Sequence, residues 1–180
     1  MLKSQIRRRW RNWSGLVQCE PNFRSYPVAV HPAHRSHAVT PLVRYNEIEY
    51  CVPVARVPEV LLQVDRLVRA LKLHAHLPLQ VRYQRADTLW LSPAYNRDSA
   101  CIAAQAYAHA PHEDWFAALA DIFDRNDGRP QWARLHDRSA HQLRQLFPRF
   151  ADFLELRREL DPRGVFLNPH LAGMFGVEDR

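Results

Sequence analysis

The spacing of apolar residues changes from that of a strand to that of a helix between residues 42 and 71. Leu42–Val52 is rich in β-branched and aromatic residues and ends at Pro53, which predicts a strand with both faces partly covered. Pro58 then suits the first turn of a helix, where its missing N–H has no cost. The following apolar residues recur at helical spacing and predict an amphipathic helix: Val57, Val60, Leu61, Val64, Leu67, Val68 and Leu71.

The middle of the chain predicts short strands followed by a second helix. Leu79–Gln84 and Leu89–Leu91 are short enough to be strands, and the apolar run Ala100–Ala108 predicts another. A second helical stripe stops before the turn signal Asn126-Asp127-Gly128. It consists of Trp115, Phe116, Leu119, Ile122 and Phe123.

The last third predicts further helices. Ser139 and Gln142 have the spacing of a capping box, so a helix should start there and break at Pro148. The apolar stripe resumes at Phe150 and continues to the turn 161–164. Because strands and helices are mixed without strict alternation, we expect an α+β fold, a mainly antiparallel sheet with helices packed on one face.

Size and composition predict one cytoplasmic domain. A chain of 180 residues with 47% hydrophobic content can bury one substantial core. It has no apolar run of about 18 residues that would span a membrane, and its basic start lacks the apolar segment of a secretory signal. Cys19, Cys51 and Cys101 are odd in number and widely spaced, which favours buried free thiols over a disulfide framework or a zinc knuckle.

Positive charge is concentrated at the start of the chain. The formal net charge is +6, and residues 1–24 alone carry +5. Such an arm, which includes Trp10 and Trp13, suits phosphates or an anionic membrane surface. No nucleic-acid module follows it, so we favour a solvated arm held down by its tryptophans and regard nucleic acid as an unlikely partner.

Three segments carry a family resemblance. Val43–Pro53 and Val81–Ser99 are similar to paired strands of the aldonolactone and alditol oxidases, and Gly128–Arg134 resembles their Gly-Arg-Pro-His-Trp-Gly/Ala-Lys motif. These flavin-linked sugar oxidases include D-arabinono-1,4-lactone oxidase and L-gulonolactone oxidase. The resemblance implies that residues 36–180 form the C-terminal substrate domain, like the cap domain of vanillyl-alcohol-oxidase-type flavoproteins, after a basic arm and connection over residues 1–35.

The motifs found along the sequence include none from the FAD-binding domain of that family. Between Pro27 and Arg35 the similarity passes directly to the substrate domain. A dinucleotide pyrophosphate is usually cradled by glycine-rich loops, whereas the five glycines here form none. We therefore expect no cofactor for this chain alone, and FAD only if a partner chain supplies it. An FAD-binding subunit or a homo-oligomer is the expected partner.

The resemblance assigns two cationic site positions. Arg82 matches the arginine of the family's Glu-x-Arg pair, with Gln80 in place of the acid, and a guanidinium there would stabilise negative charge. Arg134 stands at the motif's lysine, where it keeps the charge but cannot readily act as a base. The structural alternative makes both arginines surface or ion-pair residues.

Four further positions complete the expected site. Gln131 replaces the motif's histidine, Trp132 remains as an apolar wall for the substrate, and Gln105 falls near a polar family position. His136 is the nearest substitute acid or base. The alternative for Trp132 is a core residue, and Asn168 is expected to bond its own backbone in a turn.

Other chemistries find little support. His31, His34 and His37 match no familiar zinc ligand set, so we expect loop histidines and no metal. No catalytic triad or P-loop is present. The sequence therefore predicts the substrate-domain portion of an FAD-linked sugar-lactone or alditol oxidoreductase that binds a small polyol or lactone. The alternatives are a repurposed non-flavin small-molecule binding protein or catalyst, and a degenerate inactive remnant.

Overall fold

The computed structural model describes residues 44–71 and 78–177. The basic arm, Cys19, the boundary near residue 35 and the histidines at 31, 34, 37, 74 and 76 lie outside these ranges. Within them, no helix is both long and apolar enough to cross a membrane. The predictions made for the arm and for that boundary stay predictions.

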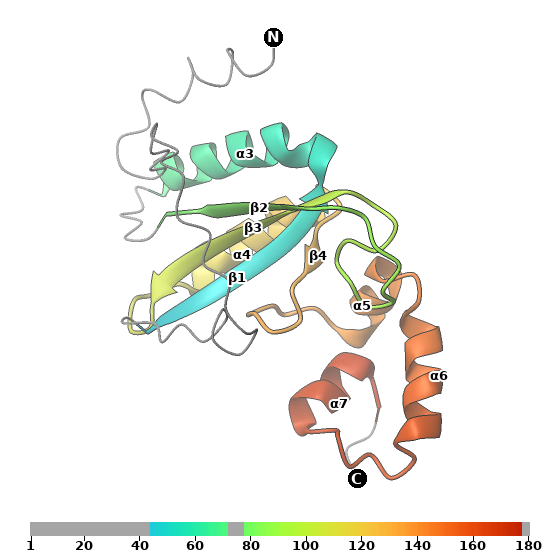
Figure 1. Ribbon diagram of the computed structural model, residues 1–180. Helices are drawn as coiled ribbons and strands as arrows, with labels where there is room; N and C mark the ends of the chain where they lie inside the picture. Colours follow the sequence, from blue (N-terminus) through green and yellow to red (C-terminus); the bar gives the residue numbers. More distant parts are fainter. Residues whose placement is uncertain (1–43, 72–77, 178–180) are drawn as a thin grey trace, which may run out of the picture.

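A four-stranded antiparallel sheet forms the centre of the described fold (Figure 1). Its spatial order is β2 (Gln80–Gln84), β3 (Ser99–Tyr107), β1 (Tyr45–Pro53) and β4 (Arg129–Pro130). β1 and β3 pair along their full lengths, from Tyr45 opposite Tyr107 to Pro53 opposite Ser99. This long ladder fixes which side chains of the two strands share a face.

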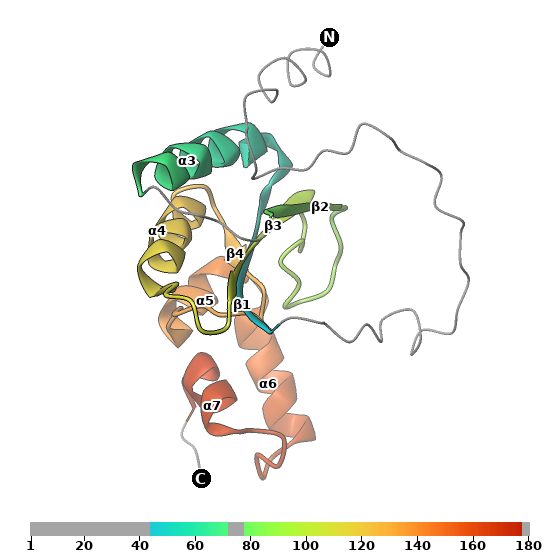
Figure 2. The ribbon, with the colours of Figure 1, turned by 90° about the vertical axis from the view of Figure 1, so that its left-hand side faces the viewer.

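Helices α3 (Val57–Ala70) and α4 (Glu113–Asp124) lie on the same side of this sheet, as Figure 2 shows. A short 3₁₀ turn, η2 (Val54–Arg56), joins β1 to α3. The helices bury their apolar stripes against one face of the strands. The first core cluster contains Ile48, Tyr50, Val52, Val57, Val60, Val64, Val68, Ala100, Ile102, Ala104, Phe116, Leu119, Ala120, Ile122 and Phe123. The predicted α+β fold with helices on one face is confirmed.

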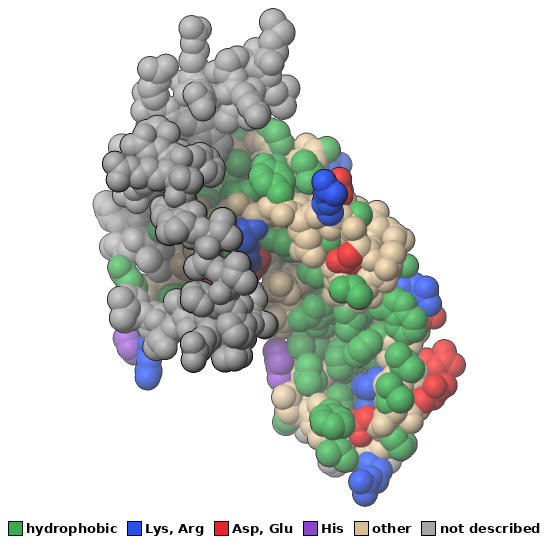
Figure 3. All heavy atoms as spheres, in the orientation of Figure 1, with side chains coloured by type: hydrophobic (Ala, Val, Ile, Leu, Met, Phe, Trp, Pro, Cys, Tyr) green, Lys and Arg blue, Asp and Glu red, His purple; other side chains and the backbone are tan. Residues whose placement is uncertain are grey.

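A second apolar cluster lies among three C-terminal helices. These are α5 (Ala140–Leu146), α6 (Phe150–Leu160) and α7 (Pro169–Phe175). Leu143, Phe147, Phe150, Leu154, Met174 and Phe175 form its buried part. Apolar side chains also gather on the surface of this part of the molecule (Figure 3).

Local signals in the sequence predicted most helix boundaries. Ser139 and Gln142 form the expected capping box, since Ser139 Oγ accepts from the Gln142 N–H and the Gln142 side chain accepts from the Ser139 N–H. Asn168 does bond nearby backbone, but as the N-cap of α7, where its Oδ1 accepts from the Leu171 N–H at 2.9 Å. Helix α7 and the two-residue strand β4 were not predicted from the sequence.

The strand predicted at Leu89–Leu91 is wrong. These residues lie in a turn in which the Ser92 N–H donates to the Leu89 carbonyl. Leu91 packs against the second cluster. Leu91 is therefore apolar because it is partly buried in a loop. An apolar run of three residues is too short to distinguish a buried loop from a strand.

The free-thiol prediction is also wrong for two of the three cysteines. Cys51 and Cys101 form a disulfide across β1 and β3, where they are register partners. They were correctly expected to be buried, with exposed fractions of 0% and 6%. A separation of 50 residues hid their contact, because adjacency across a sheet depends on register.

Candidate functional site

The face of the sheet turned away from α3 and α4 carries polar side chains. On β1, Glu47, Glu49 and Cys51 alternate with the core residues, so all three point to this second face. Glu49 is 1% exposed and Glu47 is 7% exposed. Buried carboxylates need charged or hydrogen-bonding partners, and those partners define the site.

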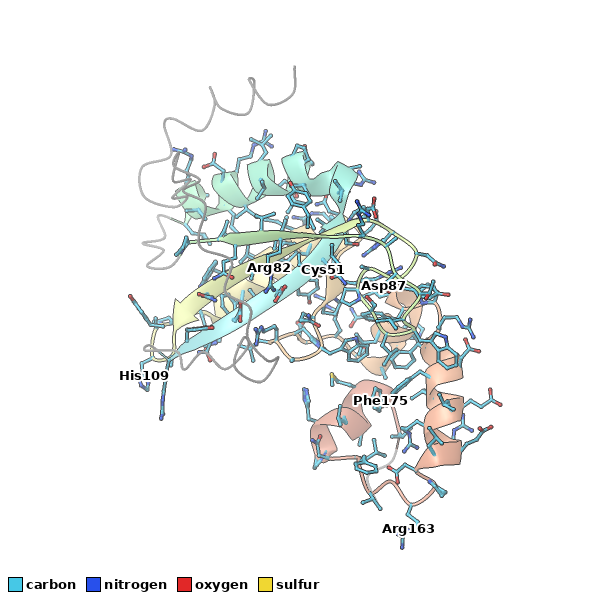
Figure 4. The ribbon with its side chains drawn as sticks, viewed as in Figure 1. Cys51, Arg82, Asp87, His109, Arg163 and Phe175 are labelled. Atoms are coloured by element: carbon cyan, nitrogen blue, oxygen red, sulfur yellow. A yellow bond between two sulfur atoms is a disulfide. The ribbon has the colours of Figure 1, made fainter. Side chains whose placement is uncertain are left out.

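Arg82 is the first partner. From β2 its Nη2 donates to Glu49 Oε1, while the Arg82 side chain stays 59% exposed. Arg82 pairs in register with Cys101 on β3 and therefore lies beside the disulfide. Figure 4 shows Arg82 and Cys51 close together at the centre of the sheet.

Arg134 is the second partner and comes from the segment after β4. That segment runs along β1, because the Gln131 N–H donates to the Glu49 carbonyl at 2.9 Å and the Leu135 N–H donates to the Glu47 carbonyl at 3.0 Å. Arg134 Nε lies 2.7 Å from Glu47 Oε2 and 3.8 Å from Glu49 Oε2. The two arginines assigned by the motifs thus meet at two carboxylates.

Gln105 completes the cluster from β3, opposite Glu47 in register. Its Nε2 donates to Glu47 Oε1 at 3.2 Å. Both Glu47 Oε2 and Glu49 Oε2 are buried; Arg134 contacts Glu47 Oε2 as an ion pair, whereas Glu49 Oε2 accepts no hydrogen bond from the described residues. We call Glu47, Glu49, Arg82, Gln105 and Arg134 the carboxylate–arginine cluster.

Gln80 and Gln131 lie beside this cluster. Gln80 is exposed and sits in the same row as Glu49, with Ala103 between them. The Gln131 side chain accepts from the N–H of Trp132 at 3.1 Å. Neither amide offers a proton acceptor of the strength of a carboxylate.

Trp132 belongs to the second apolar cluster. Its ring packs against Phe147, Phe150 and Phe175, and its Nε1 donates to the Leu91 carbonyl at 2.8 Å. Trp132 therefore packs against a core cluster, as in the structural alternative given for this residue.

His136 has a distinct environment. Its Nδ1 accepts from the Arg138 N–H at 3.3 Å, and its buried Nε2 has no hydrogen-bond partner in the described residues. Burial lowers the pKa of His136, and the neighbouring charges of His170 and Arg138 lower it further. Since a ring nitrogen that accepts is unprotonated, we assign the proton of the neutral ring to Nε2.

Two arginines missed by the sequence analysis hold the 85–98 loop against the sheet. Arg129 Nη1 donates to the carbonyls of Pro93 and Tyr95, and Arg97 Nη2 donates to the Cys51 carbonyl at 3.0 Å. Burial lowers the pKa of Arg97 to about 10, with the charge of Arg129 adding to the effect. Arg97 and Arg129 therefore lie beside Cys51, next to the carboxylate–arginine cluster.

Metal and FAD fit this face poorly. Ligand atoms of Glu49, Cys51 and Cys101 lie within 4.8 Å of one another, but the disulfide occupies both sulfurs. Three glycines of the described residues have structural roles: a Cβ on Gly128 would lie 2.7 Å from the Phe123 carbonyl oxygen, and Gly164 and Gly176 have positive φ. They form no cradle for a pyrophosphate.

A hollow of about 450 Å³ lies away from this face, on the helical side. It is lined by residues of α3 and α4 that include Glu59, Arg66 and Asp121, and by Arg125 at the C-terminal end of α4. Its lining therefore carries both carboxylates and guanidiniums. The carboxylate–arginine cluster remains the stronger candidate site because its two carboxylates are buried beside partly exposed arginines.

Comparison with known proteins gives a consistent family. Residues 8–174 match the family model for D-arabinono-1,4-lactone oxidase. The chain is 37% identical to an L-gulono-1,4-lactone dehydrogenase of Mycobacterium tuberculosis (strain ATCC 25618 / H37Rv), over 80% of this chain and 34% of that protein. It is 33% identical to the L-gulonolactone oxidase of Mus musculus, over 71% of this chain and 30% of that protein. It is also 33% identical to an alditol oxidase of Streptomyces sp. (strain IKD472 / FERM P-14339), over 70% and 30%. It spans about a third of the length of these curated relatives. With most of its length matched, the chain belongs to the D-arabinono-1,4-lactone oxidase family.

Proposed function

We propose that the carboxylate–arginine cluster binds the hydroxyl groups of a sugar lactone or alditol. The chain would then supply the substrate-binding face of an FAD-linked sugar-lactone or alditol oxidoreductase. The supporting observation is that Glu47 and Glu49 are both buried and paired with two arginines, and that Glu49 Oε2 accepts no hydrogen bond from the described residues. The family of the chain supports the same class of ligand.

The chemistry of such a ligand suits the cluster. Polyol hydroxyls donate to carboxylates, and guanidiniums donate to carbonyl or ring oxygens of a lactone. Arg82 and Arg134 are 59% and 40% exposed at the side chain, so they can rearrange to admit a ligand. A hydroxyl entering beside Arg134 would donate to Glu49 Oε2, and movement of Arg134 would free Glu47 Oε2 for a second hydroxyl.

Proton removal from a carbinol oxygen needs a base. Gln80 and Gln131 carry amides and cannot serve, and the guanidinium of Arg134 is a hydrogen-bond donor without an acceptor atom. We assign this role to a Glu49 or Glu47 carboxylate oxygen, which would take the proton while the arginines stabilise the developing negative charge. From the sequence, His136 was the candidate acid or base, and neither glutamate was predicted to take part.

FAD would be held by residues other than those described, in an FAD-binding partner chain that faces this side of the sheet. The described residues lack a pyrophosphate cradle and would contribute only the substrate contacts. The bound flavin would supply the electron acceptor.

Calorimetric titration of the purified chain tests the proposal with D-arabinono-1,4-lactone, L-gulono-1,4-lactone and xylitol as probes. We expect Arg134→Ala and Glu47→Gln to weaken binding about tenfold or more, because each removes a charge-assisted hydrogen bond. Arg158→Ala, at an exposed position of α6, is the matched control. Binding of all probes that is equally strong in the Arg134 and Arg158 variants would exclude the cluster as the ligand site.

A second candidate is a sugar-binding protein that does not use flavin, a role favoured by Gln80 and Gln131 at motif positions that carry an acid and a histidine in the family. The two candidates separate when the chain is mixed with an FAD-binding chain of the family. Association and lactone-dependent bleaching of the flavin absorbance support the oxidoreductase. Probe binding without either result supports the second candidate, and absence of probe binding and association supports an inactive remnant.

A further inference from the structure

One row of side chains crosses the whole sheet beside the carboxylate–arginine cluster. In strand order it reads Arg82, Cys101, Cys51 and Arg129, each a register partner of the next. Register partners project to the same face. The disulfide is therefore flanked on both sides by arginines.

The backbone keeps the two cysteines opposite each other independently of the sulfur–sulfur bond. β1 and β3 pair from Tyr45 and Tyr107 at one end to Pro53 and Ser99 at the other, so register pairs lie on both sides of the cysteines. Opening the disulfide would leave both sulfurs in place. Two thiols held as neighbours re-form their bond readily when an oxidised exchange partner is present.

The surrounding charge favours thiolates. Arg82 and Arg129 occupy the same row, and Arg97 donates to the Cys51 carbonyl. The opposing charge closest to the sulfurs is Glu49, which has a carboxylate oxygen within 4.8 Å of both and which is itself paired with Arg82. Cationic neighbours stabilise a thiolate, the form of cysteine that exchanges with disulfides.

The same charges disfavour a metal ion at this position. Glu49 and the two reduced cysteines have the proximity of a soft-metal ligand set. Arg82 is already paired with Glu49, Arg134 lies 3.8 Å from it, and Arg129 occupies the same row as the cysteines. A cation would be repelled, whereas a thiolate is stabilised.

We propose that Cys51 and Cys101 form a redox-active pair that undergoes reversible exchange with a dithiol reductant. A thiolate of the reductant attacks the sulfur of Cys101, the more exposed of the two. The sulfur–sulfur bond breaks, and its electron pair leaves on Cys51 as a thiolate beside Arg97 and Arg129. The second thiolate of the reductant then attacks the mixed disulfide, which releases reduced Cys101 and the cyclic disulfide of the reductant, while the reductant's two protons pass to the cysteines or to solvent.

The test incubates the full chain in buffers of reduced and oxidised dithiothreitol at graded ratios. Thiols are then trapped by alkylation and counted by mass spectrometry, in a Cys19→Ser background. We expect Cys51 and Cys101 to be reduced together and reoxidised reversibly while the circular dichroism spectrum stays native. Reduction only in denaturant, or loss of the native spectrum on reduction, would overturn the proposal.

Arg82 provides the control for the charge argument. Arg82→Met should slow native-state alkylation of the reduced pair about tenfold, the factor that one pKa unit represents, whereas Arg82→Lys and Arg158→Met should leave it nearly unchanged. If Arg82 does not stabilise the thiolate, the three variants should be alkylated at equal rates. Equal alkylation rates would therefore also count against the proposal.

Discussion

Burial predicts an unequal response when the two sides of the carboxylate–arginine cluster are mutated. Glu49 is 1% exposed, whereas the Arg82 and Arg134 side chains are 59% and 40% exposed. Glu49→Gln leaves two arginines that water can solvate, so it should cost less than about 1 kcal/mol. Arg134→Met leaves the buried charges of Glu47 and Glu49 with one partner fewer.

The size of the second effect follows from the cost of isolating a buried charge. Removing one partner of a fully buried pair costs about 3–5 kcal/mol. Because Arg134 is itself partly exposed and water can enter its place, we expect about 2 kcal/mol for Arg134→Met, or roughly 4–8 °C in Tm for a chain of this size. Adding Glu47→Gln to Arg134→Met should recover part of this loss, since it removes the charge left unpaired.

Urea unfolding followed by circular dichroism measures these differences as midpoints at constant slope. Arg158→Met serves as the matched control for loss of an exposed arginine. The reasoning fails if Glu49→Gln destabilises the protein as much as Arg134→Met. It also fails if Glu47→Gln adds to the loss in the Arg134→Met background.

Three further predictions concern the framework around the site. Ser139→Ala removes the capping box of α5 and should cost about 1 kcal/mol in urea unfolding. Gly128→Ala places a Cβ 2.7 Å from the Phe123 carbonyl oxygen and should cost about 1–3 kcal/mol, with unchanged stability refuting this close approach. The backbone N–H of Phe166 is the main cause that lowers the pKa of Asp161. The Asp161 carboxylate therefore stabilises the fold above about pH 4, and this stabilisation is lost as the pH falls through the lower pKa of the folded state. Urea midpoints measured against pH should fall less steeply in acid for Asp161→Asn than for the wild type.

Local patterns predicted the elements whose signals lie within a few residues. The stripe of α3 and the capping box at Ser139 depend on neighbours one helical turn away, so sequence was sufficient. β4 has only two residues, Arg129 and Pro130. Its existence depends on pairing with β1, which no local pattern reveals.

The candidate site was predicted only in part for the same reason. Arg82 and Arg134 were found through motifs, but their actual partners come from β1. A signal for these partners was present, because Glu47 and Glu49 alternate with Ile48 and Tyr50 and so share one strand face. The disulfide needed the register of β1 against β3.

The two apolar clusters bear on how the molecule opens. The polar face belongs to the β-sheet, whose other face packs on the first cluster. Helices α5, α6 and α7 surround a separate apolar cluster. Regions with their own buried contacts can unfold with their own free energies. Amide exchange should therefore resolve two protection levels, and transient melting of the C-terminal helices would leave the strands that position the carboxylates folded.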